Sequence, residues 1–378
     1  MRILHVIPGL ANASGPTHVV TRYAERFVMR GHEVSVFHVS GRGKDAVVLP
    51  AGIDNRSFPA QIAKGWAFSP ALSRAVQSEL SSFDLVHIHS LWCYPNRVVR
   101  QASLKFGVPY VVRPAGSLEP WSMGVSALRK QLYFQAIEKA NLNHATAVHA
   151  MSRKEAEHIG AYGLQPPIWT IPNGVDPISP LDEEVKKRVR MSLGIAPDAS
   201  MIVFLGRLHP VKNLSFLLDV FRDLRTQHPE VHLVLAGPDQ GSYAETLKRQ
   251  VADEGLHDCV TFYGEIRGDE KVALLQTADA LCLPSLSENF GNVVLEALAS
   301  GTAVFASDTT PWTELDGWGC GRCLPLEHEV WVSALATSIA SGGLPEWGVE
   351  ARRVAMEHFS WDVVADRLEA AYQEVLAP

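Results

Sequence analysis

The sequence predicts an α/β protein made of two Rossmann-like domains, each with a doubly wound parallel sheet. Short apolar runs alternate with amphipathic stretches along most of the chain, which is the pattern of repeated βαβ units. This series is interrupted at the turn-forming Pro172-Asn173-Gly174 and the charged stretch that follows, and then starts again. The length of 378 residues also favours two domains over one.

The first half of the chain contains a series of predicted strands. Each is a short apolar run bounded by Gly, Pro or polar residues, and the stretches between them carry apolar residues at helical spacing. Strands that are joined through helices are parallel, so these strands should form one parallel sheet. The expected strands are 2–8, 33–39, 84–89, 108–113, 145–152 and 168–171, with helices at 17–30, 69–82, 96–106 and 126–140 and one capped by Ser152.

The second half repeats this pattern and is followed by a further amphipathic segment at 361–376. The expected strands are 201–206, 231–236, 259–263, 280–283 and 303–306, with helices near 213–227, 242–254, 269–277 and 291–300. The final segment has apolar residues at helical spacing. They are Trp361, Val364, Leu368 and Tyr372. The expected divisions are a first domain at 1–174, a second at 175–360 and a C-terminal helix within 361–378.

Composition excludes several classes of protein. With 47% hydrophobic and 20% charged residues, the chain can bury large cores. A net charge of −7 argues against binding to a nucleic-acid backbone. No apolar run is long enough to cross a bilayer, and the start of the sequence lacks a signal-peptide core, so we expect a cytoplasmic protein. Five scattered cysteines suit a reducing compartment, and the lone Cys320-x-x-Cys323 pair is a weak zinc candidate.

One stretch carries two acidic residues in a setting that suits ligand binding. A strand at 280–283 ends at a proline, and a helix is expected from about 290 to 300. Glu288 lies in the loop, and Glu296 should lie about two helical turns further in, roughly 12 Å at 1.5 Å per residue. Between them, backbone N–H groups at the helix N-terminus offer a cradle for phosphate. They belong to Asn289, Phe290, Gly291 and Asn292. This order suits a sugar, a diphosphate and a ribose.

A second motif places two cations at the end of strand 201–206. Gly206 allows close approach to the backbone. Arg207 and Lys212 follow it, beside the start of the next helix. Two cations there suit the negative charge that grows on a departing nucleoside diphosphate. No D-x-D motif stands between the strands, so we expect no catalytic metal.

Together these motifs resemble the donor site of the retaining family 4 glycosyltransferases. The likeness rests on Glu288-x7-Glu296 within PSLSENFGNVVLEALASG and on the G-R-x-x-x-x-K-N pattern from Gly206, and it runs over most of the chain. It implies the GT-B fold, in which an acceptor-side first domain and a donor-binding second domain face each other across a cleft. In this fold the C-terminal helix, here 361–378, crosses back to the first domain. It also implies a nucleoside-diphosphate sugar of UDP or GDP type as co-substrate, and no cofactor. Arg207 and Lys212 would hold the diphosphate, Glu288 the sugar hydroxyls and Glu296 the ribose.

The same resemblance assigns two further donor-binding residues. Ile266 follows strand 259–263, and its backbone should lie against the base. Gly15 stands where family members usually carry a Gly-Gly pair facing the donor phosphate or the acceptor. A plain turn residue explains Gly15 equally well.

Three residues of the first half are acceptor-side candidates. His89 ends a strand, at a carboxyl end where ligands bind in open α/β sheets. A strand end capped by local hydrogen bonds is an equal alternative. Arg113 stands where many family members carry a histidine, and Glu119 follows it within R-x-x-G-x-L-x-P-W. A structural ion pair between Arg113 and Glu119 explains them equally well.

The function that this resemblance favours is transfer of a sugar, with retention, to a carbohydrate or lipid-linked acceptor in polysaccharide biosynthesis. Two alternatives stay open: a nucleotide-sugar 2-epimerase on the same architecture, and a non-catalytic sugar-nucleotide-binding subunit. The helix at 126–140 is basic and amphipathic, which would allow peripheral contact with the inner membrane surface. A plain surface helix over a core has the same pattern.

Overall fold

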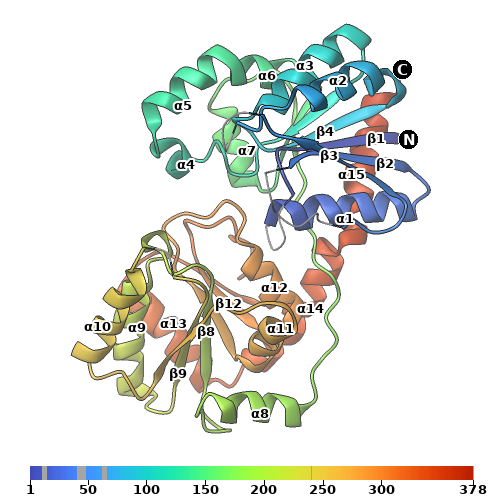
Figure 1. The fold of residues 1–378 in the computed structure, drawn as a ribbon. Coiled ribbons are helices and arrows are strands. Elements are labelled where there is room, and N and C mark those ends of the chain that lie inside the picture. The colour runs from blue at the N-terminus through green and yellow to red at the C-terminus, as the bar shows by residue number, and fades with distance from the viewer. Residues whose placement is uncertain (11–14, 41–47, 62–65, 240, 378) are drawn as a thin grey trace. The chain divides into compact units, whose positions relative to one another are not determined.

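A computed structural model describes the chain except for residues 11–14, 41–47, 62–65, 240 and 378. The chain folds into two compact units (Figure 1). The first unit comprises Met1–Gly174 and Trp361–Pro378, and the second comprises Val175–Ser360. Each unit has its own sheet, and each is described separately below.

The first unit is built on a seven-stranded sheet with the order β3-β2-β1-β4-β5-β6-β7. All neighbouring strands are parallel, and the order reverses direction at β1 and β4, as in a doubly wound sheet. The strands are β1 (Arg2–Ile7), β2 (Glu33–Ser40), β3 (Ile53–Pro59), β4 (Leu85–His89), β5 (Tyr110–Arg113), β6 (Ala147–Ala150) and β7 (Ile168–Thr170).

Helices cover both faces of this sheet. Successive strand residues point to opposite faces, so Leu4 and Val6 of β1 join one core and Ile3 and Ile7 the other. The second core includes residues of α15, which packs beside α1 (Figure 1). The helices are α1 (Gly15–Met29), α2 (Pro70–Glu79), α3 (Tyr94–Phe106), α4 (Pro120–Gly124), α5 (Ala127–Tyr133), α6 (Lys139–Asn143), α7 (Arg153–Gly160) and α15 (Trp361–Leu376).

The single helix predicted at 126–140 is wrong in detail. A π turn (Phe134–Glu138) separates α5 from α6. The extra residue in this turn accompanies the burial of Glu138, whose carboxylate accepts bonds from the Trp92 N–H at 2.6 Å and from Asn141 Nδ2 at 2.8 Å. Helical periodicity alone does not reveal such a turn, because it depends on a partner in another segment.

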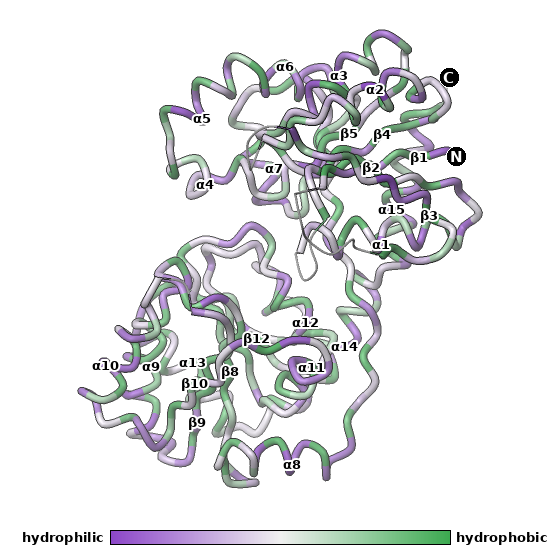
Figure 2. The backbone as a smooth tube through the Cα atoms, in the orientation of Figure 1, coloured by the Kyte–Doolittle hydropathy of each residue, from purple (hydrophilic) through white to green (hydrophobic). Residues whose placement is uncertain are grey.

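The second unit has a six-stranded parallel sheet with the order β10-β9-β8-β11-β12-β13. Its central strands are buried, and Figure 2 shows β8 and β12 as predominantly hydrophobic. The strands are β8 (Met201–Leu205), β9 (His232–Ala236), β10 (Val260–Gly264), β11 (Ala280–Leu283), β12 (Ala303–Ser307) and β13 (Gly321–Leu324).

The helices of the second unit form two groups. In one, α9 packs against α10 and α13; in the other, α12 packs against α11 and α14, and α11 also contacts α8 (Figure 1). The helices are α8 (Glu183–Ser192), α9 (Leu214–Gln227), α10 (Tyr243–Asp253), α11 (Gly268–Thr277), α12 (Asn292–Ser300), α13 (His328–Ala340) and α14 (Leu344–Phe359). Parallel, helix-covered sheets in both units confirm the predicted α/β class.

The chain passes between the two units twice, after Gly174 and after Ser360. Within the second unit, the Val175 N–H donates to the Phe359 carbonyl at 2.8 Å, and Val175 pairs with Ser360 in a parallel bridge. Within the first unit, Gly174 packs so closely on Trp361 that a Cβ there would lie 2.4 Å from the indole ring. Short-range packing therefore fixes the chain on both sides of each passage.

Candidate active site

The segment from β11 to α12 forms the centre of the candidate site. β11 is fully buried between β8 and β12, and a loop of residues 284–291 follows it. The carbonyl of Ser285 accepts bonds from Ser307 Oγ at 2.6 Å and from Thr309 Oγ1. Two hydroxyl groups at the end of the neighbouring strand β12 therefore hold the start of the loop.

Glu288 lies in this loop and forms an ion pair with Lys212. Lys212 is the last residue of a 3₁₀ turn (Pro210–Lys212) that comes shortly after β8. Its Nζ contacts Glu288 Oε1, and Ser285 Oγ donates to the same oxygen at 3.0 Å. Both charged side chains are only 12% exposed. The structure thus brings the two sequence motifs together through a pair that the sequence analysis did not predict.

Gly206 stands at the end of β8, where two backbone segments meet. Its N–H donates to the Ala236 carbonyl at 2.9 Å, and a Cβ on Gly237 would lie 1.8 Å from the Gly206 carbonyl oxygen. Only a glycine at position 237 permits this approach. Arg207 follows at the surface of the unit. A cation is therefore placed at the carboxyl end of β8, beside the turn that holds Lys212.

The helix α12 begins at Asn292, with Gly291 as its N-cap residue. Gly291 has φ 75°, in the left-handed region that favours glycine. Asn292 is exposed, Asn289 is half-buried, and Phe290 is buried. The first N–H groups of a helix have no partner inside the helix, and the helix dipole is positive there. The local structure therefore suits the phosphate cradle that the sequence predicted.

Glu296 lies in the first half of α12. Because α12 begins at Asn292, Glu296 is about one turn into the helix, roughly 6 Å along its axis, so only the second half of the span from Glu288 to Glu296 is helical. Its carboxylate accepts a bond from Lys271 Nζ of α11 at 2.7 Å. The two side chains are 32% and 29% exposed, so this is a surface pair that solvent screens.

Ile266 lies in the short loop between β10 and α11, and its side chain is buried. This loop leaves the same edge of the parallel sheet as Gly206 and the 284–291 loop, since all three follow the carboxyl ends of strands. In open α/β sheets that edge is where ligands bind. The donor-side residues of the second unit thus share one edge of one sheet.

The donor candidate of the first unit, Gly15, is exposed and is the first residue of α1. The sequence predicts a helix from residue 17. The helix therefore begins two residues earlier than predicted. Part of the loop before it lies outside the described residues.

Arg113 and Glu119 do not form the ion pair considered above. Arg113 is buried at the end of β5 and donates to Asn173 Oδ1 at 2.6 Å. Glu119 is also buried and accepts a bond from His158 Nδ1 at 2.6 Å. Burial raises the pKa of the Glu119 carboxyl, and the neighbouring His158 opposes that shift. Each residue thus has its own partner inside the first unit.

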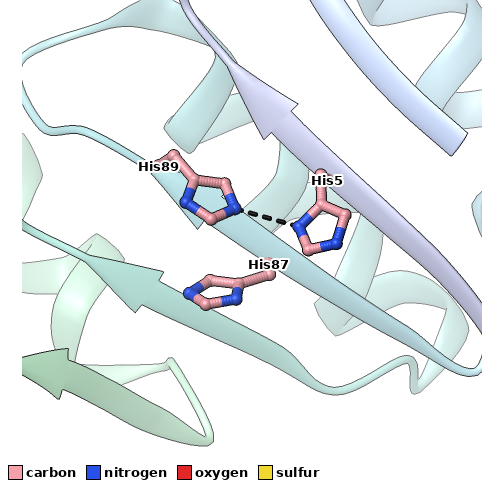
Figure 3. A group of neighbouring side chains, drawn as sticks. All are labelled: His5, His87 and His89. Atoms are coloured by element: carbon pink, nitrogen blue, oxygen red, sulfur yellow. Dashed lines mark hydrogen bonds between the residues drawn. The ribbon is translucent and has the colours of Figure 1, made fainter. Parts of the chain in front are cut away.

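His89 belongs to a cluster of buried histidines on neighbouring strands. Figure 3 shows the rings of His5 and His89 turned toward each other, with His87 beside them, and His5 Nδ1 lies 2.9 Å from His89 Nε2. His87 continues the contacts, with Nδ1 2.5 Å from the Tyr372 hydroxyl of α15 and Nε2 3.4 Å from His149 Nδ1. Burial lowers the pKa of all four imidazoles, to about 3 for His5 and His149.

Nitrogen atoms of His5, His87 and His89 lie within 4.8 Å of one another, a spacing that a metal ion could bridge. Three imidazoles can bind a metal ion, but the nearby positive charge of Arg113, which lowers the pKa of both His87 and His89, disfavours a cation at this place. A divalent cation would add to that charge in a fully buried region. The nitrogens that face one another are already within hydrogen-bond distance, so we interpret the group as a hydrogen-bonded array.

Comparison with known proteins identifies the family. Residues 14–174 match the glycosyl transferase 4-like domain, and residues 185–315 match glycosyl transferases group 1. The chain belongs to the family 4 glycosyltransferases. It is therefore an enzyme, a glycosyltransferase of the hexosyltransferase type, and the epimerase alternative is not favoured.

Curated relatives cover nearly the whole glycosyltransferase. The D-inositol 3-phosphate glycosyltransferase of Gordonia bronchialis is 28% identical over 98% of this chain and 86% of its own length. That of Actinosynnema mirum is also 28% identical, over 97% of this chain and 93% of its own.

Solved structures confirm the predicted GT-B fold. HepE from Anabaena in complex with UDP superimposes with a TM-score of 0.78 at 21% identity, covering 99% of this chain and 100% of that one. WaaG, a glycosyltransferase involved in lipopolysaccharide biosynthesis, gives 0.72 at 18% identity and covers 100% of both chains.

Sequence reasoning missed several residues that shape the glycosyltransferase's candidate site. Lys271 lies 25 residues before its partner Glu296, and Ser307 and Thr309 lie more than 20 residues after the carbonyl they contact. One signal was available: a hydroxyl-rich stretch directly after a predicted strand in a parallel sheet should lie beside the neighbouring strand end.

Proposed function

We propose that this glycosyltransferase moves a hexose from a UDP- or GDP-linked donor to a carbohydrate or lipid-linked acceptor, with retention of configuration, in polysaccharide biosynthesis at the cytoplasmic side of the membrane. The observation that carries the proposal is the meeting of Lys212 and Glu288 at the ends of β8 and β11, beside the N-terminus of α12. A cation, a carboxylate and a helix N-terminus at one sheet edge offer partners for phosphate and for sugar hydroxyls.

The Lys212–Glu288 pair indicates how the two charges would change partners when the donor binds. In the absence of donor, each charge neutralises the other in a setting that is only 12% exposed. A diphosphate that contacts Lys212 would replace the carboxylate as its counter-charge, and Glu288 would then accept bonds from sugar hydroxyls. The donor thus provides a new partner for Lys212 and another for Glu288, so neither buried charge is left unpaired.

In the proposed reaction, the acceptor hydroxyl attacks the anomeric carbon on the face from which the diphosphate leaves. The bond between the anomeric carbon and the phosphate oxygen breaks, and a bond to the acceptor oxygen forms. The hydroxyl proton passes to the leaving phosphate, which removes the need for a protein base. Arg207 and Lys212 stabilise the charge that grows on that phosphate.

Donor choice is tested by thermal shift with UDP, GDP and ADP. With all three at the same concentration, the preferred nucleotide should give the largest rise in Tm, and one present at 100 times its dissociation constant stabilises the native state by about 2.7 kcal/mol. Titration of UDP-glucose and GDP-mannose with panels of acceptors should follow. Because the relatives above are named for D-inositol 3-phosphate, that acceptor belongs in the panel. A purified protein that neither binds UDP or GDP nor transfers sugar would contradict the proposal.

The stereochemistry and the epimerase alternative are tested together by NMR of the product. The transferred sugar should keep the anomeric configuration of the donor. When the donor is incubated without acceptor, its sugar should be released only slowly by hydrolysis. The released sugar should have an unchanged configuration at C2. An inverted anomer or a C2-epimerised sugar would contradict the proposed reaction.

Peripheral membrane contact is proposed for the surface formed by α4 and α5. Four large apolar residues there are exposed: Trp121 at 52%, Val125 at 58%, Leu128 at 74% and Leu132 at 65%. Leu128 and Leu132 are four residues apart on α5 and share one face, with the exposed Arg129 beside them. Apolar residues bordered by a cation suit the interface of an anionic bilayer. Among the helices of the described residues, none has the length and hydropathy needed to cross a membrane.

Vesicle co-sedimentation tests this surface. The protein should bind vesicles with phosphatidylglycerol more strongly than vesicles of phosphatidylcholine alone, and salt should weaken the binding. Leu128→Asp combined with Leu132→Asp should abolish binding but leave transfer to a water-soluble acceptor unchanged. The matched control is Val349→Asp, because Val349 is 70% exposed on α14 of the other unit. Equal binding by all three proteins would contradict the membrane proposal.

A further inference from the structure

Trp312 lies directly behind the loop that precedes α12. It follows β12 in the chain, and its side chain is 2% exposed. Its Nε1–H donates to the carbonyl of Phe290 at 2.5 Å. An indole has this single polar hydrogen and no acceptor, so the bond satisfies the polar capacity of the buried ring.

The ring of Trp312 is fixed by its neighbours. It packs against Phe290 with centroids 5.2 Å apart and against Phe359, at the end of α14, with centroids 5.4 Å apart. It also faces Gly291, where an added Cβ would lie 3.2 Å from Trp312 Nε1. The indole therefore has little freedom to turn its N–H elsewhere.

This bond fixes the direction of one peptide group. The carbonyl of Phe290 and the N–H of Gly291 belong to the same planar trans peptide, so they point in opposite directions. When Trp312 binds the carbonyl on the buried side, the Gly291 N–H is turned away from the indole. That N–H belongs to the N-cap residue of α12, at the positive end of the helix dipole.

We propose that Trp312 is a positioning residue which orients the Phe290–Gly291 peptide so that the Gly291 N–H faces the β-phosphate and sugar of the donor. The inference rests on the proposed function, since it assumes that the donor lies against this loop. Without the indole bond, the peptide could rotate and present a carbonyl, which repels phosphate, in place of the N–H. Trp312 thus acts through the backbone and does not itself touch the donor.

The test compares UDP with UMP by calorimetric titration, with GDP and GMP in parallel. Trp312→Phe keeps an aromatic ring but removes the N–H. Affinity for UDP should fall by about ten-fold, the value of one hydrogen bond to a charged group. Affinity for UMP should stay unchanged, because its base and ribose contacts lie elsewhere. A purely structural role would instead lower both affinities or neither.

Trp331→Phe is the matched control. Trp331 is a fully buried tryptophan of the same unit, on α13, and its Nε1–H donates to the Pro325 carbonyl at 2.9 Å. Trp331→Phe therefore removes the same indole N–H and its bond to a backbone carbonyl, but at a position away from the loop. Trp331→Phe should lower Tm but leave the ratio of UDP to UMP affinity at the wild-type value. A wild-type ratio in Trp312→Phe, or an equal change in both variants, would overturn the proposal.

Gly291→Ala gives a second test of the same peptide, and it decides if Trp312→Phe does not fold. The new methyl group would press on Trp312 Nε1 and would disfavour the positive φ. The same selective loss of UDP affinity is expected, and an unchanged ratio would contradict the proposal. A wild-type protein that binds neither UDP nor GDP would refute the proposed function instead, so the two failures are distinguishable.

Discussion

The two sheets of this glycosyltransferase share a topology but place their polar residues in opposite ways. In the first sheet β1 lies between β2 and β4, and in the second sheet β8 lies between β9 and β11. In both sheets the strand order reverses direction at this first strand. In the second unit the polar groups, such as Lys212 and Glu288, lie in loops beyond the strand ends and carry charge. In the first unit His5 and His87 lie within the strands and are fully buried.

The difference shows that topology alone does not make a ligand site. A charged side chain in a loop that follows a strand can exchange its partner for a ligand. A histidine inside a strand is covered by helices and keeps the partner that the sheet provides, as His87 does with Tyr372 of α15. We therefore expect substitutions in the second unit to change catalysis, and substitutions of the buried histidines to change stability and its dependence on pH.

The largest effect is expected for Lys212→Ala. Loss of a donor to the charge that develops on a leaving group typically lowers kcat by about 10²–10³-fold. The substitution also leaves the Glu288 carboxylate without its cation, so Tm should be measured on the same sample. Lys248→Ala is a suitable control, because Lys248 pairs with Glu245 on the exposed surface of α10. Near-wild-type turnover by Lys212→Ala would show that this residue is not at the donor.

Arg207→Lys tests the second cation that is assigned to the diphosphate. It keeps the charge but loses the planar fork of the guanidinium, so turnover should fall by less than in Lys212→Ala. Because both cations are assigned to one diphosphate, the double variant Arg207→Ala, Lys212→Ala should lose less than the product of the single losses. Fully multiplicative losses in kcat would indicate that the two residues act independently.

A smaller effect, mainly on binding, is expected for Glu296→Ala. Contacts to ribose hydroxyls are made in the ground state and the transition state alike, so the donor KM should rise, by roughly ten-fold for one charged hydrogen bond, more than kcat falls. Lys271→Ala removes only the surface partner of Glu296 and serves as a control with a weaker effect. A collapsed kcat at unchanged donor KM would rule out the ribose assignment.

The buried histidines give a pH-dependent prediction for the first unit. The folded-state pKa of His5 is lowered from 6.5 to about 3, so the unfolded chain binds more protons between these values. The stability that neutral His5 contributes is complete above pH 6.5 and is lost as the pH falls, by about 1 kcal/mol per pH unit. His5→Gln should therefore be more destabilising at pH 7.5 than at pH 5 in urea unfolding.

The difference between wild type and His5→Gln reports the loss of His5 together with its effect on the pKa of the neighbouring His87 and His89. Burial raises the pKa of Glu119, Glu138 and Glu155 in the same unit, which favours the folded state at lower pH and opposes the histidines. Those carboxyls are common to both proteins and cancel in the comparison. An equal loss of unfolding free energy at the two pH values would show that His5 is not buried as a neutral imidazole.

The smallest effect is expected from chelation. With Arg207 and Lys212 assigned to the diphosphate, EDTA should leave kcat and the donor KM unchanged. The comparison is made with and without added Mg²⁺ or Mn²⁺. Activity that disappears in EDTA and returns with either ion would mean that the two cations do not suffice.

Much of the fold followed from local signals, because many of the strand and helix boundaries are marked by residues at the boundary itself. The apolar run before Pro284 gave β11, and Gly301 marked the end of α12. The edge strands β3 and β13 were missed. Within β3, which spans Ile53–Pro59, Phe58 is the one buried residue, so the alternation that identifies a strand is nearly absent. Such strands depend on pairing with a neighbour rather than on their own pattern.

The candidate site was only partly predictable for a related reason. The residue types at Glu288 and Lys212 indicated that the two side chains could bind a sugar and a diphosphate. Their pairing across 76 residues, however, comes from the order of strands in the sheet. The same holds for the histidine array, where His5 stands opposite His87 in the register of β1 and β4. Once the two strands are placed side by side, the histidines in L-H-V and V-H-I-H meet, but a single sequence does not give that placement.

The return of α15 to the first unit inverts the order in which the protein is completed during synthesis. The second unit is continuous in sequence and is whole once Ser360 has left the ribosome. The first unit begins earlier but still lacks Trp361, Leu368 and Tyr372, which fill its core against α1. We expect the nascent first unit to keep an apolar face uncovered until α15 emerges. Ribosome stalling or premature termination before α15 is synthesised would therefore harm the amino-terminal half.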